Sequence, residues 1–203
     1  TTTINSLTLK GGLQADGSYK MPTVWVPEGA TLVRNSNKIN LDLIVNAKTW
    51  YPFAVPFAAK NNEYVEYLNP VLAAASTYGT HFAIKTYDGA RRAKVGEDKA
   101  NNWVRVLRDS TLQPGVGYII TALTYPDKDT ATIRIPMTVP NTWFQNGEQA
   151  EVGTTVRNTI AVTAHAGAAA TEHQRHAGWN FVANPYLTSF TGGNVANDDG
   201  LTY

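Results

Sequence analysis

Three of the four histidines lie close together in the sequence and are the first candidates for metal chemistry. They are His165, His173 and His176, with Glu172 beside the second. A zinc or nickel ion needs imidazoles that converge on one point. His173 and His176 could converge on a helix, whereas residues three apart on a strand point to opposite faces. Because their surroundings are rich in Ala and Gly and contain no HExxH motif, we predict a solvated loop and no metal cofactor.

Signatures of enzyme chemistry are also missing. The sequence contains no cysteine and no G-x-S-x-G motif, so a thiolate nucleophile and the common serine nucleophile motif are excluded. The 16 acidic residues show no diagnostic spacing, and Asp127 and Asp129 fall in a predicted turn. Asn197 to Gly200 resembles half of a calcium loop, but Val195 occupies a ligand position. We therefore predict that the chain is not an enzyme and needs no cofactor.

Seven cations between residues 85 and 108 could attract a polyanion. Tyr87 and Trp103 lie among them, as in proteins that bind single-stranded nucleic acid. However, the chain carries a formal net charge of only +1, and a strand–hairpin–strand spreads these charges over both faces. We predict a solvated hairpin and no nucleic-acid partner, and a polyanionic glycan is the more plausible ligand if the domain is exported. The cations are Lys85, Arg91, Arg92, Lys94, Lys99, Arg105 and Arg108.

The five tryptophans offer the best hypothesis for ligand binding. Exposed aromatic rings stack on sugar rings, while neighbouring polar groups bond the hydroxyls. Trp143 lies in a loop-like segment, and Trp103 lies among the cations, so these two are our predicted glycan contacts. Trp50 and Trp179 occur in apolar, strand-like segments and are predicted to be in the core, whereas Trp25 could face either way.

Composition and patterning predict an all-β protein. Hydrophobic residues make up 43% and charged residues 16%, which excludes a disordered chain. Apolar and polar residues alternate over residues 39 to 45 and 132 to 139, as expected of half-buried strands. Pro136 cannot donate a ladder hydrogen bond, so its strand should lie at an edge or carry a bulge there. The one helix that the pattern favours is a short one at residues 69 to 76.

We expect an antiparallel two-sheet sandwich, jelly-roll-like, in which residues 1–45 and 46–203 differ. Residues 1–45 hold short apolar pairs between turns, typical of a β-solenoid cap, a strand meander or part of the sandwich itself. No signal peptide is recognisable at Thr1, and the chain looks excised from a longer protein, truncated near its C-terminal end. No apolar run approaches about 20 residues, so we expect no direct membrane insertion.

Two segments of the sequence resemble each other. Trp50 to Phe57 and Trp179 to Tyr186 both place Pro six residues after Trp and an aromatic residue seven after it. The pattern predicts a core tryptophan, a short buried strand and an extended exit imposed by X-Pro. We expect the two segments to hold equivalent places in the sandwich.

Four motifs together resemble a module of large surface-exposed proteins of Bacteroidales (Bacteroidetes). They are WYPFAVPF (50–57), YDGARRAKVGEDKANNW (87–103), LQPGVGYII (112–120) and HAGWNFVANPYLTSF (176–190). Their order and approximate spacing match that family over about residues 45 to 190. The sequence departs from the pattern at Ala183, where Gly is usual, and at Gln113–Pro114, where Glu-Ala is commoner.

The resemblance implies a β-sandwich in a secreted or cell-surface protein and supplies no catalytic residues. It favours a non-catalytic structural or adhesive module whose partners are a glycan or host-surface ligand and other domains or subunits of the same assembly. Two alternatives are a carbohydrate-binding module and an accessory domain of a secreted hydrolase. A third is a subunit that completes its sheet with a strand from a partner.

Overall fold

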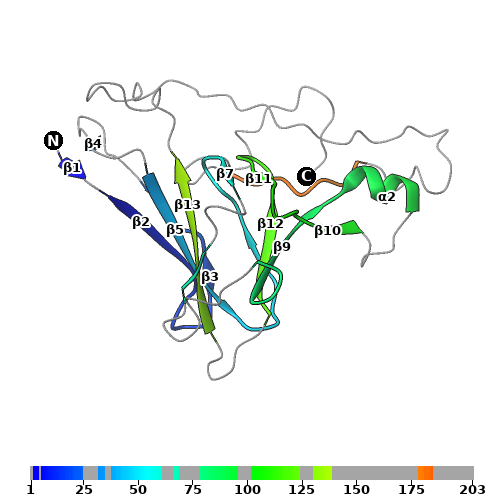
Figure 1. The fold of residues 1–203 in the computed structure, drawn as a ribbon, viewed down its shortest axis with the longest axis horizontal. Coiled ribbons are helices and arrows are strands. Elements are labelled where there is room, and N and C mark those ends of the chain that lie inside the picture. The colour runs from blue at the N-terminus through cyan, green and yellow to red at the C-terminus, as the bar shows by residue number, and fades with distance from the viewer. Residues whose placement is uncertain are drawn as a thin grey trace.

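Two β-sheets form the body of the protein, as the sequence predicts (Figure 1). The computed structural model describes residues 2–4, 6–24, 32–34, 38–60, 66–68, 78–95, 102–123, 130–138 and 178–184. The five-stranded sheet has the order β3 (Tyr19–Lys20), β2 (Leu7–Leu13), β5 (Lys38–Asn46), β13 (Thr130–Thr138) and β8 (Glu66–Leu68). The four-stranded sheet has the order β10 (Trp103–Arg105), β9 (Phe82–Tyr87), β12 (Tyr118–Ala122) and β6 (Tyr51–Phe53).

Two smaller pairs of strands accompany these sheets. β11 (Thr111–Leu112) pairs with β7 (Ala59–Lys60) in antiparallel fashion. β1 (Thr2–Ile4) pairs with β4 (Leu32–Arg34) in parallel. Within the described residues most pairings are antiparallel, so the protein is an all-β sandwich of the predicted class.

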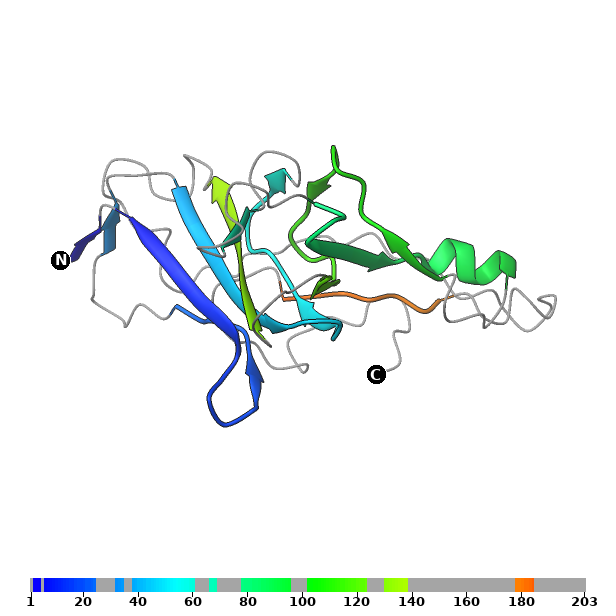
Figure 2. The ribbon, with the colours of Figure 1, turned by 60° about the horizontal axis from the view of Figure 1, so that its bottom comes forward.

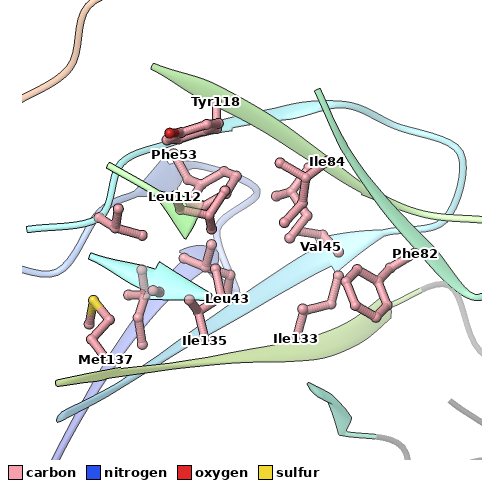
Figure 3. Close-up of a cluster of buried hydrophobic side chains, with 14 of the residues drawn as sticks. Leu43, Val45, Phe53, Phe82, Ile84, Leu112, Tyr118, Ile133, Ile135 and Met137 are labelled. Carbon is pink, nitrogen blue, oxygen red and sulfur yellow. The ribbon is translucent and has the colours of Figure 1, made fainter. Parts of the chain in front are cut away.

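The predicted alternation builds the core between the two sheets. Ile39, Leu41, Leu43 and Val45 of β5 are all buried. On β13 the buried residues are likewise every second one, Ala131, Ile133, Ile135 and Met137. Figure 3 shows side chains of both strands meeting those of Phe53, Ile84, Leu112 and Tyr118 from the other side of the core. Each such aliphatic side chain contributes roughly 1.5–3 kcal/mol when it leaves water.

The position of Pro136 agrees with its missing N–H. It pairs with Asn40 of β5 on one side of β13. On the other side, β8 pairs only with Thr132 to Arg134 and stops before Pro136. Within the described residues, β13 is therefore an edge at Pro136 even though it is an inner strand two residues earlier.

Strands from the N-terminal region belong to the five-stranded sheet. β2 runs parallel to β5 over six pairs, and β5 pairs along its whole length with β13. The boundary predicted at residue 45 therefore falls at the end of β5. Contact between β2 and β5 is very close at Gly12, where φ is +94° and a Cβ would lie 2.2 Å from the Ile44 carbonyl oxygen. Only glycine fits both the conformation and the space.

An ion pair lies on the outer face of the five-stranded sheet. Arg134 of β13 stands directly opposite Asp42 of β5. Arg134 donates from Nε to Oδ1 and from a terminal guanidinium nitrogen to Oδ2, both at 2.8 Å. Asp42 is only 6% exposed although it points away from the core. Such a two-pronged, charge-assisted pair fixes the relative position of two neighbouring strands as well as adding energy.

The connection between β9 and β10 corrects the predicted hairpin. The two strands do pair antiparallel, with Trp103 opposite Tyr87, but residues Gly89–Val95 form a helix, α2, and not a simple turn. Asp88 caps it by accepting the Arg91 N–H at Oδ1 (2.8 Å), which satisfies a donor of the first turn. Arg92 and Lys94 lie in the last turn, where cations favour the helix dipole. The short helix predicted at residues 69 to 76 lies outside the described residues.

α2 projects away from the sandwich, at the end farthest from β1 (Figures 1 and 2). Figure 2 also shows the segment 178–184 running toward this helix. In the described part of the chain, no helix has the length and apolar character needed to cross a membrane.

Candidate aromatic binding surface

Trp103, one of the two predicted glycan contacts, lies in β10 and is half-buried. Its ring meets the rings of Tyr87 and Phe181 edge-on, with centroid distances of 5.3 and 5.4 Å. Such edge-to-face pairs stabilise a fixed ring arrangement. The structure thus gives Trp103 a supporting position between two aromatic neighbours. The other predicted contact, Trp143, lies outside the described residues, as do Trp25 and the three clustered histidines.

Trp50 and Trp179 are surface residues, so the prediction that they belong to the core was wrong. Trp179 is 60% exposed and Trp50 is 36% exposed. The core places near Trp50 are filled by Phe53, Val55 and Phe57, which follow it. Trp179 belongs to the segment 178–184 beside the four-stranded sheet, in which no residue is fully buried. The sequence pattern does not reveal where the sheet ends, so it does not distinguish a core tryptophan from one at the margin.

Backbone hydrogen bonds hold the Trp179 segment in place. Gly117 N–H donates to the Phe181 carbonyl (2.8 Å), and Ala183 N–H donates to the Gly115 carbonyl (2.9 Å). Val182 therefore stands opposite Val116 in an antiparallel bridge. The Phe181 ring lies directly against Gly117, where a Cβ would be 2.3 Å from a ring carbon. The exposed indole is thus attached to the residues immediately before β12 by two hydrogen bonds and one packed ring.

The two tryptophan-led segments lie on opposite sides of β12. Residues separated by an even number on a strand direct their N–H groups to the same side. Leu123 N–H donates to His81, next to β9, and Gly117 N–H donates to Phe181. The segment 178–184 therefore lies on the β9 side of β12, and it begins where the β9 ladder ends at Thr86. The Trp50 segment continues into β6, which pairs with the other side of β12.

Arg92 connects α2 to the exposed indole. Its guanidinium carbon lies 4.7 Å from the centre of the Trp179 ring. A terminal guanidinium nitrogen also donates to the Tyr87 hydroxyl at 2.9 Å. We call Tyr87, Arg92, Trp103, Trp179 and Phe181 the α2 cluster. Residues from β9, α2, β10 and the 178–184 segment thus meet at one place, although more than 90 positions separate Tyr87 from Trp179.

Two more cations of the predicted basic run cover aromatic rings. Lys85 Nζ lies 4.8 Å from the Trp50 ring centre, and the Arg105 guanidinium lies 5.0 Å from that of Tyr78. The basic run is therefore only partly the solvated hairpin that the sequence predicts. The contact of Lys85 with Trp50 provides a second cation–aromatic pair, on the other side of β12, for comparison with the α2 cluster.

Helix α2 itself is positively charged. α2 contains Arg91, Arg92 and Lys94 and no acidic residue. Asp88, immediately before it, is engaged as the helix cap. A guanidinium next to an exposed indole can bind an anionic group while the indole stacks on an apolar ring face. This arrangement is suited to binding a ligand that carries both an anionic group and an apolar ring face.

Groups that could perform acid–base or metal chemistry do not gather in this cluster. Burial raises the pKa of Tyr19 and of Tyr118, but Tyr118 belongs to the core and Tyr19 to β3, at the end of the five-stranded sheet. Across the described ranges, no three side chains of the metal-ligating types come together. The predicted loop at Asn197 to Gly200 lies outside these ranges.

The fold defines the class of this protein as an all-β two-sheet sandwich with an aromatic and cationic cluster at one end. Comparison with models of protein families, with curated proteins and with solved structures gave no match. Of the cluster residues, the sequence analysis singled out Trp103 as a glycan contact and named Arg92 in the basic run, but it assigned Trp179 to the core. A usable signal was present, because Asp88 followed by Ala, Arg and Lys residues is typical of a capped helix start.

Proposed function

We propose that this chain is a non-catalytic β-sandwich module of a larger exported bacterial protein and that it acts in adhesion at the cell surface. The observation that carries the proposal is the α2 cluster, in which an indole that is 60% exposed is held on a sheet by backbone hydrogen bonds. A large aromatic ring kept at the surface by the fold is typical of a recognition site. Its partners would be a glycan or another host-surface ligand, and other domains of the same assembly.

The resemblance to the Bacteroidales surface module supports an extracellular location. The described parts of its four motifs contain β6, the connection from the end of β9 through α2 to the start of β10, the start of β12, and the 178–184 segment, all of which lie in or beside one sheet. The motifs therefore describe the part of the fold that carries the cluster. Protease treatment of intact cells that produce the parent protein tests the location, because a surface module is cleaved without lysis and an internal one is not.

Adhesion is tested with the purified chain on an array of glycans and host-surface proteins. We expect retention on at least one class of surface and its loss in Trp179→Ala. Trp103→Ala should weaken retention less, because Trp103 supports the neighbouring Phe181 ring and is itself half-buried. Trp143→Ala tests the remaining predicted contact. Turnover of an array glycan by the purified chain would contradict the non-catalytic role.

A second candidate function is carbohydrate binding as a dedicated module, which the exposure of Trp179 favours over a purely structural role. Sugar rings present apolar C–H faces that stack on indole, and such stacking is the usual anchor of glycan recognition. In that case retention is confined to the glycans of the array and is competed by soluble oligosaccharide.

A further inference from the structure

We propose that the α2 cluster binds an acidic sugar, that is, a pyranose ring that carries a carboxylate. The ring would stack on Trp179, and the carboxylate would bind the cations of α2. This inference rests on the proposed binding function of the same surface and adds the chemical class of its ligand.

The first step is the geometry of the indole. Arg92 covers one face of the Trp179 ring at 4.7 Å, yet 60% of the side chain stays exposed. The accessible surface therefore includes the face away from Arg92. A flat apolar face of this size matches the C–H face of a pyranose.

The second step is the rigidity of the site. Trp179 lies two residues from Phe181, whose carbonyl and ring are both fixed at Gly117. Arg92 is fixed twice, by the ring of Trp179 and by the hydroxyl of Tyr87. A ligand therefore meets groups that are already ordered, which lowers the entropy lost on binding.

The third step is charge. Arg91 and Lys94 are exposed, and their spacing of three residues places them on one side of α2, next to the side from which Arg92 contacts Trp179 but distinct from it. α2 contributes no acidic side chain to oppose them. Guanidinium and ammonium groups bind carboxylates well, and arginine can do so through two parallel hydrogen bonds. A neutral sugar would leave these cations unused, whereas the carboxylate of an acidic sugar stacked on Trp179 is attracted to the charge of the neighbouring helix.

The matched comparison is Trp50. It is exposed and carries Lys85 over its ring, but it lies on the other side of β12, and in the described part of the chain no cationic helix lies beside it. Trp50→Ala therefore removes an exposed indole under a cation without touching α2. It serves as the control for Trp179→Ala in every measurement.

The experiment measures binding of the full chain to oligogalacturonate and to neutral maltohexaose by isothermal titration calorimetry, with near-ultraviolet circular dichroism to verify folding. We expect oligogalacturonate to bind at least about tenfold more tightly than maltohexaose, in line with the 1.4 kcal/mol that one charge-assisted contact can supply. Trp179→Ala should abolish this binding, while Trp50→Ala should leave it unchanged. The double variant R91Q/K94Q should lose most of the preference for the acidic ligand, and added salt should do the same.

Other outcomes separate the inference from the function on which it rests. Equal binding of both oligosaccharides that depends on Trp179 overturns the acidic-sugar inference and leaves the binding function standing. Retention on host proteins but on no glycan, again dependent on Trp179, also overturns the acidic-sugar inference and leaves the binding function standing. Tighter binding of a single-stranded oligonucleotide or of a sulfated glycan than of oligogalacturonate also overturns the inference. If folded chain binds none of these probes or surfaces, both the inference and the adhesive function are wrong.

Discussion

The two tryptophan-led segments share a sequence pattern and a strand partner but serve the molecule differently. The Trp50 segment continues into β6 and then places Phe53, Val55 and Phe57 in the core. The Trp179 segment pairs with the residues just before β12 and places Val182 and Trp179 at the surface. The difference teaches that the pattern does not fix burial: the segment that pairs with β12 itself reaches the core, whereas the segment that pairs at Val116, before β12 begins, stays at the surface.

The largest expected effect comes from breaking the buried segment. Phe53→Ala removes a buried ring that packs on Tyr118 (centroids 5.5 Å apart) and should lower the free energy of unfolding by about 3–5 kcal/mol. Urea denaturation monitored by circular dichroism measures this. Trp179→Ala is the matched variant and should cost under about 1 kcal/mol, as is usual for exposed positions. Equal costs for the two variants would contradict the contrast between the segments.

Gly117→Ala should release the surface segment without opening the core. The new methyl group would lie 2.3 Å from the Phe181 ring, so the segment must shift, at a cost of about 1–3 kcal/mol. Faster hydrogen exchange at the amides of Gly117 and Ala183 reports the loss of their bonds. Adding Phe181→Ala removes the clash, and the double variant should recover part of that protection. Unchanged exchange in Gly117→Ala would show that the ring does not hold the segment.

The two cation–aromatic pairs should differ in strength. Lys85→Ala removes only the contact with Trp50 and should cost about 0.5–1 kcal/mol. Arg92→Ala removes the contact with Trp179 together with the hydrogen bond to Tyr87, which adds about 1 kcal/mol. Urea unfolding of both variants and of wild type measures the difference. A larger loss for Lys85→Ala would reverse the proposed order of the two sites.

The smallest expected effect is a loss of stability at alkaline pH, which arises from the ionisation of buried tyrosine side chains such as that of Tyr118 in β12. Burial raises the pKa of Tyr118 above the ordinary tyrosine value of about 10, and the hydrogen bond that its oxygen accepts from the Gln113 N–H opposes this in part. Because the unfolded chain releases this proton first, stability is full below about pH 10 and falls as pH rises through the pKa of the folded state.

Tyr118→Phe tests this assignment, because it should reduce the slope of unfolding free energy against pH above 10. Tyr19, whose pKa burial also raises and whose ring stacks on Tyr51 at 4.8 Å, should make a separate contribution that Tyr19→Phe removes. A slope unaffected by either substitution would show that other groups control the alkaline limit.

Local alternation predicted the fold class because burial on one face imposes period two on β5 and β13. The edge-like position of Pro136 could also be predicted, because proline has no N–H and therefore restricts strand pairing wherever its strand lies. The parallel pairing of β2 with β5 could not be predicted, because it depends on the close approach at Gly12 of segments some thirty residues apart. The exposure of Trp179 depends on where the β9 ladder ends, and α2 depends on the cap at Asp88, which a turn would also tolerate.

The ion pair between Asp42 and Arg134 has a consequence for how the sheet finds its alignment. A slip of two residues between β5 and β13 would keep every apolar side chain on the core face, so hydrophobicity alone does not exclude it. Such a slip would place Arg134 opposite Asn40 or Ile44 and would leave the carboxylate of Asp42 beside Thr132 or Pro136. A buried carboxylate without its partner is costly. The pair of Asp42 and Arg134 therefore disfavours misaligned pairings of β5 and β13 that hydrophobic burial alone would permit.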